Sequence, residues 1–266
     1  MNRIFGRLVS AVLVGLLCTL GCKSNEPAKP KGEEGNVAGS AVSRTPPDPA
    51  RLGTVSGDIH FSGKPPAPVK IDMSQDPVCS LTGGDNFAEQ YIVHDGKLAN
   101  VYIYVKSGPP AAMSAPAPQN TTIAVIDQIG CKYVPHVIAV MRGDSVEFRN
   151  SDGTMHNIHT LPTAEGSQPI DISQGPKGTP QTKQFNHVEV MIPVRCNNHP
   201  WMNAFVNVSA TPFFAVSGSD GHFTIHGLPA GTYTLAAVHE KLGEQTMTVT
   251  VEPEQTAKAD FSFSMK

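Results

Sequence analysis

The sequence predicts an all-β protein, and three observations support that class. Apolar and polar residues alternate in short runs over most of the chain, for example in residues 55–61, 101–105 and 247–251. Turn sequences rich in Gly, Pro and Asp separate these runs, as in residues 228–231. Beyond the first 21 residues, no run of about ten residues keeps a helical period. Packed β-sheets therefore account best for the chain.

The N-terminal residues 1–21 have the pattern of a signal peptide. Arg3 and Arg7 precede an apolar run over residues 8–20, which is too short for a membrane span of about 20 apolar residues. The run ends in Thr-Leu-Gly-Cys22, which resembles the bacterial lipoprotein box. The resemblance implies that Cys22 is acylated and anchors an extracytoplasmic protein to a bacterial membrane, on the periplasmic side of the outer membrane in a Gram-negative cell. A Thr stands where the family usually has Leu, which leaves plain secretion open.

Residues 22–52 are expected to form a disordered tether. They are rich in Pro, Gly, Ser, Ala, Lys and Glu and show no apolar periodicity, so they cannot bury enough surface to offset the entropy lost on ordering. Removal of residues 1–21 takes away two arginines and no acidic residue, which lowers the formal net charge from −3 to −5. A mildly acidic chain without a basic stripe argues against nucleic-acid binding.

Cysteine, histidine and methionine recur at every third position in Cys196, His199 and Met202. A strand would send such residues to alternating faces, whereas a tight loop between two strands can turn all three toward one point. Pro200 favours the loop, because proline lacks the N–H that a ladder needs and keeps the residue before it extended. The alternating residues that predict the two flanking strands are Val188, Val190, Ile192 and Val194, then Phe205, Val206 and Val208.

Another histidine, His156, lies upstream in a second loop. A thiolate, two imidazoles and a thioether form a ligand set that copper prefers, and a trigonal His2Cys plane with a weak axial Met is that of electron-transfer copper sites. Cys196 as a small buried hydrophobe and Met202 as a packing residue are the alternatives. His159, three positions beyond His156, is a further candidate ligand, although a place facing solvent or one behind a ligand suits it better.

Residues 118–210 resemble the cupredoxins, or blue copper proteins, with a ligand loop of the amicyanin type. The upstream part of the resemblance is an aromatic residue and a proline, a strand, a Gly-Asp turn, a second strand and Asn-x-Asp ahead of His156. The resemblance implies a Greek-key sandwich over residues 116–210 that binds one copper through the four residues His156, Cys196, His199 and Met202. It also implies that Asn157 hydrogen-bonds the two ligand loops together.

The same resemblance implies that His199 reaches the surface inside an apolar patch and passes electrons to a redox partner protein. Pro200 and Trp201 are candidates for that patch, and core packing is the alternative for Trp201.

The cysteines then leave one pair. Cys18 leaves with the signal peptide, Cys22 takes the lipid and Cys196 binds the metal, so Cys79 and Cys131 remain in an oxidising compartment. We expect a disulfide between them. Two buried free thiols are the alternative.

Residues 213–251 resemble the carboxypeptidase regulatory-like, or transthyretin-like, β-sandwich family through the pattern D-G-x-F-x-I-x-G-L-P-x-G-x-Y within residues 219–235. Residues 53–66 look like the opening strands of the same family. We therefore expect residues 53–115 and 211–266 to share one sandwich, with the cupredoxin inserted between its halves. Tandem domains are the alternative.

These features predict a carrier of single electrons through one mononuclear copper rather than an enzyme. No hydrolase-type Ser-His-Asp or Cys-His arrangement is evident, and the extra His-x-His pairs of multicopper oxidases do not occur. Two alternatives stay open: a protein that stores or delivers copper, and a non-redox module that binds a surface partner.

Overall fold

The computed structural model describes residues 51–82, 84, 86–118 and 122–265. The predicted signal peptide, Cys22 and nearly all of the predicted tether lie outside the described residues. The all-β prediction is confirmed, since strands dominate and the described helices are short: α1 (Pro77–Thr82) and α2 (Pro110–Met113). Within the described part, no helix has the length and apolarity needed to cross a membrane.

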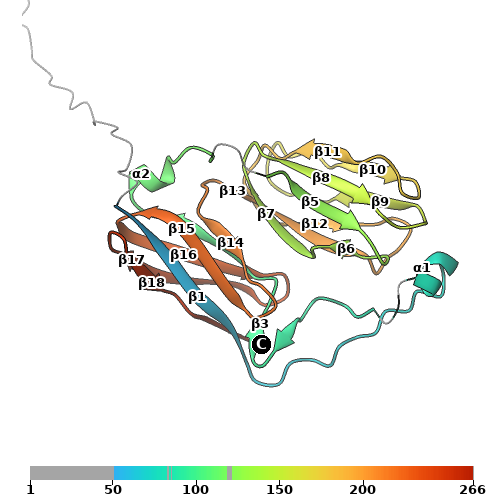
Figure 1. The fold of residues 1–266 in the computed structure, drawn as a ribbon, viewed down its shortest axis with the longest axis horizontal. Helices are drawn as coiled ribbons and strands as arrows, with labels where there is room; N and C mark the ends of the chain where they lie inside the picture. The colour runs from blue at the N-terminus through green and yellow to red at the C-terminus, as the bar shows by residue number, and fades with distance from the viewer. Residues whose placement is uncertain (1–50, 83, 85, 119–121, 266) are drawn as a thin grey trace, which may run out of the picture. The chain divides into compact units, whose positions relative to one another are not determined.

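The first sandwich is built from both ends of the described chain (Figure 1). One of its sheets contains β1 (Leu52–Ser62), β2 (Val93–His94), β3 (Lys97–Leu98), β15 (His222–Pro229), β18 (Thr256–Lys258) and β19 (Phe261–Ser264). The other contains β4 (Tyr102–Ser107), β14 (Phe214–Val216), β16 (Gly231–His239) and β17 (Gly243–Val251). β1 pairs with β15, β18 and β19, and β4 pairs with β14 and β16. The N-terminal and C-terminal segments therefore share both sheets.

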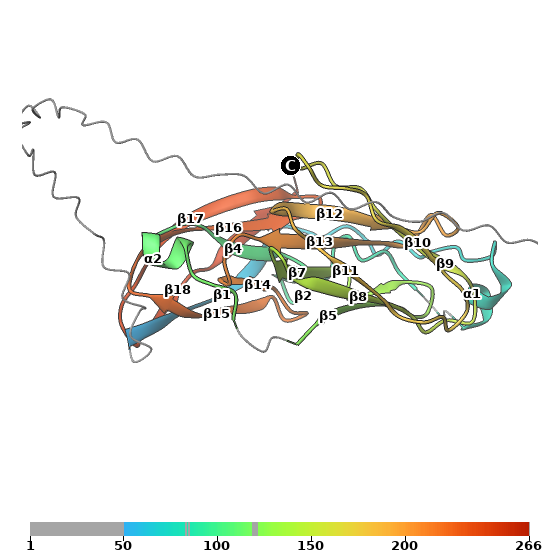
Figure 2. The same ribbon diagram turned by 90° about the horizontal axis from the view of Figure 1, so that it is seen from above.

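The second sandwich lies between these segments in the sequence. One of its sheets has the order β10 (Asp171–Gln174), β9 (His156–Thr160), β12 (Glu189–Arg195), β13 (Asn203–Ser209) and β7 (Val137–Met141). The other has the order β11 (Gln181–Gln184), β8 (Ser145–Asn150), β5 (Ala124–Gln128) and β6 (Tyr133–Val134). Figure 2 shows the two layers, with β12 and β13 in one and β5 and β8 in the other.

Alternation along the strands forms a separate apolar core in each sandwich. In β1, every second side chain is buried, including Val55, Ile59 and Phe61 of the first core. In β8, Val146 and Phe148 enter the second core, and Glu147 between them is only half-buried. Each core is thus closed by the inner faces of two sheets, as expected for a sandwich.

One stretch of the N-terminal segment does not stay with the first sandwich. The sequence assigned residues 53–115 as a whole to that sandwich, but Met73 and Cys79 are buried in the core of the second one. Asn86 donates a side-chain hydrogen bond to the carbonyl of Gly130, 2.8 Å away. Met73, Cys79 and Asn86 therefore pack against the second sandwich, a placement that strand alternation alone does not reveal.

The strand before the ligand loop is also less regular than its sequence predicts. The register of β12 against β13 shifts between Glu189 and Ile192, and Met191 has a φ of 54°. Because of this bulge, Val188 is exposed and Glu189 is buried instead. Glu189 finds its partners in the backbone N–H and the hydroxyl of Thr163. The predicted inward alternation holds only for Ile192 and Val194.

Candidate metal centre

The ligand loop spans Cys196 to Met202, between the ends of β12 and β13. Two backbone hydrogen bonds close it. The N–H of Met202 donates to the carbonyl of His199 at 2.9 Å, and the N–H of Cys196 donates to the carbonyl of Met202 at 3.4 Å. This tight turn points the side chains of Cys196 and His199 into the sandwich, where both are buried.

His156 is the first residue of β9 and faces the same point. Its Nδ1 lies 2.9 Å from Nδ1 of His199, and Nδ1 of His199 lies 3.5 Å from Sγ of Cys196. The three ligand atoms lie within 4.8 Å of one another. The exposed fractions of His156, Cys196 and His199 are 0%, 5% and 3%. Two imidazoles and one thiol thus converge in a site that is almost closed to solvent.

Each of the two imidazoles is hydrogen-bonded to a carboxylate through its Nε2. Nε2 of His156 lies 2.9 Å from Oδ2 of Asp152, and Nε2 of His199 lies 3.1 Å from Oδ2 of Asp76. An ionised carboxylate only accepts hydrogen bonds, so both Nε2 atoms carry a proton and donate it. In the neutral imidazole the other nitrogen is then a bare acceptor. In the neutral form of each ring, Nδ1 is therefore the nitrogen that can bind a metal at the point where Cys196 also lies.

The charges of the site are consistent with this arrangement. Burial disfavours the charged form of Cys196, but hydrogen bonds from His156, Asn157, Asn198 and His199 outweigh it and lower the thiol pKa to about 6. Burial likewise opposes the charge on His156, but its hydrogen bonds to Asp152 and Cys196 raise its pKa to about 9. Both pKa shifts favour a thiolate beside an imidazolium in the metal-free site, so a metal that binds Nδ1 of His156 displaces a proton.

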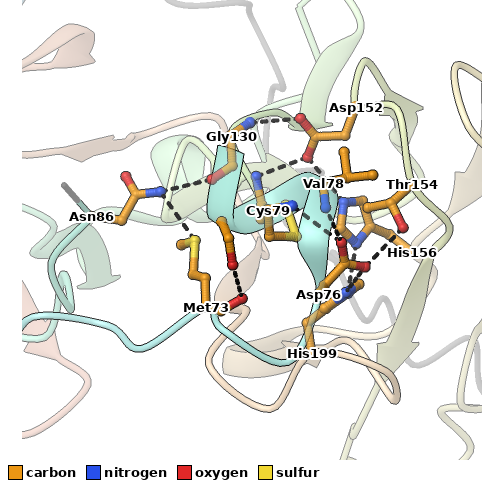
Figure 3. The surroundings of a disulfide bond; sticks show 12 residues. Met73, Asp76, Val78, Cys79, Asn86, Gly130, Asp152, Thr154, His156 and His199 are labelled. Carbon is orange, nitrogen blue, oxygen red and sulfur yellow. Dashed lines mark hydrogen bonds and ion pairs between the residues drawn. A yellow bond between two sulfur atoms is a disulfide. The ribbon is translucent and has the colours of Figure 1, made fainter. Parts of the chain in front are cut away.

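The disulfide between Cys79 and Cys131 joins the segments that supply the two carboxylates. Asp76 lies just before the helix that contains Cys79, and Asp152 accepts the backbone N–H of Cys131 at 2.8 Å and that of Gly130 at 2.7 Å. Figure 3 shows Asp76 and Asp152 on either side of this bridge, each reaching its own histidine. The disulfide thereby ties together the supports of both imidazoles.

Other residues singled out from the sequence contribute in different ways. The backbone N–H of Asn157 donates to Sγ of Cys196 at 3.3 Å and so connects the two ligand loops, while its side-chain amide donates to Ser173 at 2.7 Å. Met202 is 1% exposed and belongs to the second core, within the ligand loop. His159 is not part of the cluster, because its Nδ1 lies 3.0 Å from Oδ1 of Asn197 near the surface.

The expected electron port is not observed. His199 does not reach the surface in an apolar patch, because it is only 3% exposed and its Nε2 is hydrogen-bonded to Asp76. Trp201 packs against the second core and donates its indole N–H to the carbonyl of Cys131 at 3.1 Å. Of the three residues proposed for the port, Pro200 alone is exposed.

Sequence reasoning missed Asp76 and Asp152. Asp152 precedes His156 by four residues, and its place in the Asn-x-Asp run gave a weak signal. Asp76 is 123 positions from His199, and its signal was the Asp-Pro pair before Cys79, which is typical of a helix N-cap followed by proline. A helix that begins after Asp76, together with the expected disulfide, would have placed Asp76 near the ligand loop.

In the described residues, a separate cluster of Asp58, His60 and Asp260 has no sulfur donor, and two further clusters share residues with the metal site and include one disulfide cysteine each. They are Asp76, Cys79 and His199, and Cys131, Asp152 and His156. Because Cys79 and Cys131 are bonded to each other, neither offers a thiolate. In the described part of the chain, Cys196 is the free cysteine. The cluster of His156, Cys196 and His199 is therefore the one suited to a soft metal.

Comparison with known proteins gives a partial family match. The model of the carboxypeptidase regulatory-like domain matches residues 194–264, which include the ligand loop and β13–β19. The strands of the first sandwich within this match complete their sheets with β1 and β4, which lie outside it. Among curated proteins, no sequence matches the chain.

Solved structures similar to this chain are cupredoxins. A copper-containing nitrite reductase from Thermus scotoductus SA-01 is 20% identical over 40% of this chain and 27% of its own, with a TM-score of 0.30. A copper(I) form of an amicyanin variant is 21% identical over 40% of this chain and 98% of its own, also with a TM-score of 0.30. A second copper(I) amicyanin variant is 22% identical over 41% and 99%, with the same TM-score. Likeness of this degree does not establish a metal or a function for this chain.

The donor set itself supports a metal. Two imidazole nitrogens and a thiolate of lowered pKa converge, and both imidazoles have acidic partners that fix their orientation. Nitrogen and soft sulfur donors suit copper, whereas magnesium and calcium prefer oxygen. A surface hollow beside the cluster, lined by Gln75, Thr154, Met155 and Asn198 together with Asp76 and His199, gives an approach from solvent. The residues present fit a copper ion.

Proposed function

We propose that this protein binds one copper ion through His156, Cys196 and His199, with Met202 as a weak axial ligand, and carries single electrons. The observation that carries the proposal is the convergence of both Nδ1 atoms with Sγ of Cys196 in a buried site. Bound copper would supply a one-electron couple between Cu(I) and Cu(II), both of which accept thiolate and imidazole ligands.

The protein's part in electron transfer is to keep the ligands in place. Asp152 and Asp76 fix the rings of His156 and His199, and the N–H of Asn157 restrains the thiolate of Cys196. Burial keeps bulk water away from the thiolate and both rings. A site whose ligands are held this firmly needs little rearrangement when the charge at its centre changes by one.

Copper storage or delivery is the second candidate function, and one observation favours it. An electron port needs a ligand edge near the surface, but the outer nitrogen of His199 is bound to Asp76. A ligand that is closed in this way offers no electron port, which favours storage or delivery of copper over electron transfer. Measured reduction potential and self-exchange rate distinguish the two functions, because a carrier exchanges electrons rapidly and a storage protein releases copper to a chelator or a partner.

The setting proposed for this function follows from the N-terminal sequence. Acylation of Cys22 would anchor the protein to a bacterial membrane on the extracytoplasmic side, and residues 22–52 would hold the sandwiches away from the lipid. A redox partner protein would exchange electrons with the copper, and the chain itself would not be an enzyme. Mass spectrometry of the N-terminal peptide from membranes tests the lipid directly.

Metal analysis of the purified protein is the first test. We expect one copper per chain after loading, a measurable reduction potential and rapid self-exchange. A chain that takes up zinc but no copper would contradict the proposal. One copper with slow self-exchange and ready transfer to EDTA would favour copper handling.

A further inference from the structure

Asp76 comes from outside the strands of the sandwich that it serves. It lies in the segment between β1 and β2, yet its Oδ2 is 3.1 Å from Nε2 of His199 and 3.0 Å from the hydroxyl of Thr154. Its other oxygen, Oδ1, accepts the backbone N–H of Val78 at 2.7 Å and that of Cys79 at 3.1 Å. Both carboxylate oxygens therefore have fixed partners.

The orientation of this carboxylate follows from the local sequence. Asp76 caps the N-terminus of α1, and Pro77 occupies the first helical position, where a missing N–H costs nothing. Ser80 adds two bonds, from its N–H to the carbonyl of Asp76 at 2.9 Å and from its hydroxyl to the carbonyl of Met73 at 2.8 Å. One oxygen is thus committed to the helix, and the other is presented to His199.

The segment is fastened to the sandwich at two buried points. Cys79 is bonded to Cys131, and Met73 lies in the second core, with exposed fractions of 1% for Cys79 and 6% for Met73. Asp76 itself keeps an exposed fraction of 18%, so it forms the outer wall of the site. Figure 3 shows the Asp76 carboxylate bonded to both Thr154 and His199, beside the helix that carries Cys79.

We propose that Asp76 is the positioning residue of His199: it holds the ring as the Nε2–H tautomer, aims Nδ1 at Cys196 and so slows the loss of copper from the site. The inference rests on the proposed copper binding and adds to it a residue that no ligand motif contains. Because α1 and its disulfide hold Asp76, the segment between β1 and β2 becomes part of the metal site.

Transfer of copper to EDTA provides the first test. Loss of a partner behind a histidine ligand costs about 10–100-fold in metal affinity, so Asp76→Ala should raise the transfer rate or lower the affinity by at least about tenfold. Asp72→Ala is the matched control, since Asp72 is exposed on the same segment and accepts its hydrogen bonds from nearby Ser74. Ser80→Ala is the control for a loosened segment that keeps its carboxylate.

The pattern across these variants decides the proposal. A loss confined to Asp76→Ala supports positioning by the carboxylate. If Asp76→Ala and Asp72→Ala retain copper equally well, the proposal is overturned. It is also overturned if Asp76→Ala and Ser80→Ala lose copper equally fast, because the stability of the segment would then account for the effect. Asp76→Asn keeps the helix cap but weakens the hydrogen bond to His199. Its copper retention should therefore fall between that of wild type and that of Asp76→Ala.

A measurement on metal-free protein separates this inference from the copper proposal. Nitrogen NMR of histidine-labelled protein should show the Nε2–H tautomer at His199 in wild type and in Asp72→Ala, and a mixture of tautomers in Asp76→Ala. An unchanged tautomer in Asp76→Ala refutes the positioning role even if copper binds. A wild-type protein that shows this tautomer but binds no copper refutes the proposed function and leaves Asp76 as a partner of His199.

Discussion

Replacement of Asp152 should strongly destabilise the metal-free protein. Its carboxylate is 7% exposed and accepts three hydrogen bonds, from the N–H of Gly130 at 2.7 Å, the N–H of Cys131 at 2.8 Å and Nε2 of His156 at 2.9 Å. Asp152→Ala leaves all three donors without this acceptor. Removal of one partner from a buried charged pair costs about 3–5 kcal/mol, and we expect a loss in this range. Asp152→Asn keeps one acceptor oxygen and should lose about 1–3 kcal/mol.

Urea unfolding followed by tryptophan fluorescence is a suitable assay. Trp201 is the single tryptophan of the chain and lies in the ligand loop against the second core, so its signal reports on the sandwich that contains Asp152. Asp171→Ala, an exposed site on β10, serves as the control and should stay within about 0.5 kcal/mol of wild type. If Asp152→Ala unfolds at the same urea concentration as this control, the carboxylate does not support the site as argued.

Three further predictions concern the ligands. His156→Ala should abolish the blue spectrum or sharply reduce copper affinity, whereas His159→Ala should change the spectrum little; the reverse result would move the ligand to the neighbouring position. Met202→Gln should retain copper but lower the reduction potential, because a harder oxygen donor stabilises Cu(I) less, and an unchanged potential would exclude Met202 as axial ligand. In metal-free protein, thiolate absorbance should appear with a midpoint near pH 6 and disappear in Cys196→Ala, and a midpoint near the ordinary thiol pKa of 9.0 would contradict the imidazolium–thiolate pair.

The same pair makes a defined contribution to pH-dependent stability. The lowered thiol pKa contributes stability that is complete above pH 9.0 and lost as the pH falls through about 6. The raised His156 pKa contributes stability that is complete below pH 6.5 and lost as the pH rises through about 9. Between pH 6.5 and about 9 the two contributions to stability change in opposite directions with pH. Folding then moves one proton from the thiol to the imidazole without net proton uptake. The pair therefore adds no net pH dependence in that window.

Local patterns were sufficient for the fold class and for much of the site. Alternation predicted the strands, and the three-residue spacing of Cys196, His199 and Met202 predicted a loop between two of them. Such signals depend on neighbours in the sequence, which is why they can be read without a structure. The expected pairing of Cys79 with Cys131 needed only a count of cysteines and their assigned roles.

Features that depend on distant contacts could not be predicted in this way. The hydrogen bond between His199 and Asp76 joins residues 123 positions apart, and the Asp-Pro pair at Asp76 indicates a helix start but not this partner. The bulge at Met191 reverses the alternation in part of β12, since a single extra residue exchanges the two faces. The first departure lies at the candidate metal centre, and the second lies in the strand that leads to the ligand loop.

The visible and EPR spectra of the copper-loaded protein test the central claim most directly, with Cys196→Ala and Cys131→Ala measured beside wild type. A thiolate bound to Cu(II) gives blue copper proteins their colour, so wild type and Cys131→Ala should show the intense band and Cys196→Ala should lack it while remaining folded. Cys131→Ala should differ through lower stability, about 4 kcal/mol for the loss of a bridge across 52 positions. A blue band that survives in Cys196→Ala, or a fully copper-loaded wild type without one, would contradict the proposed site.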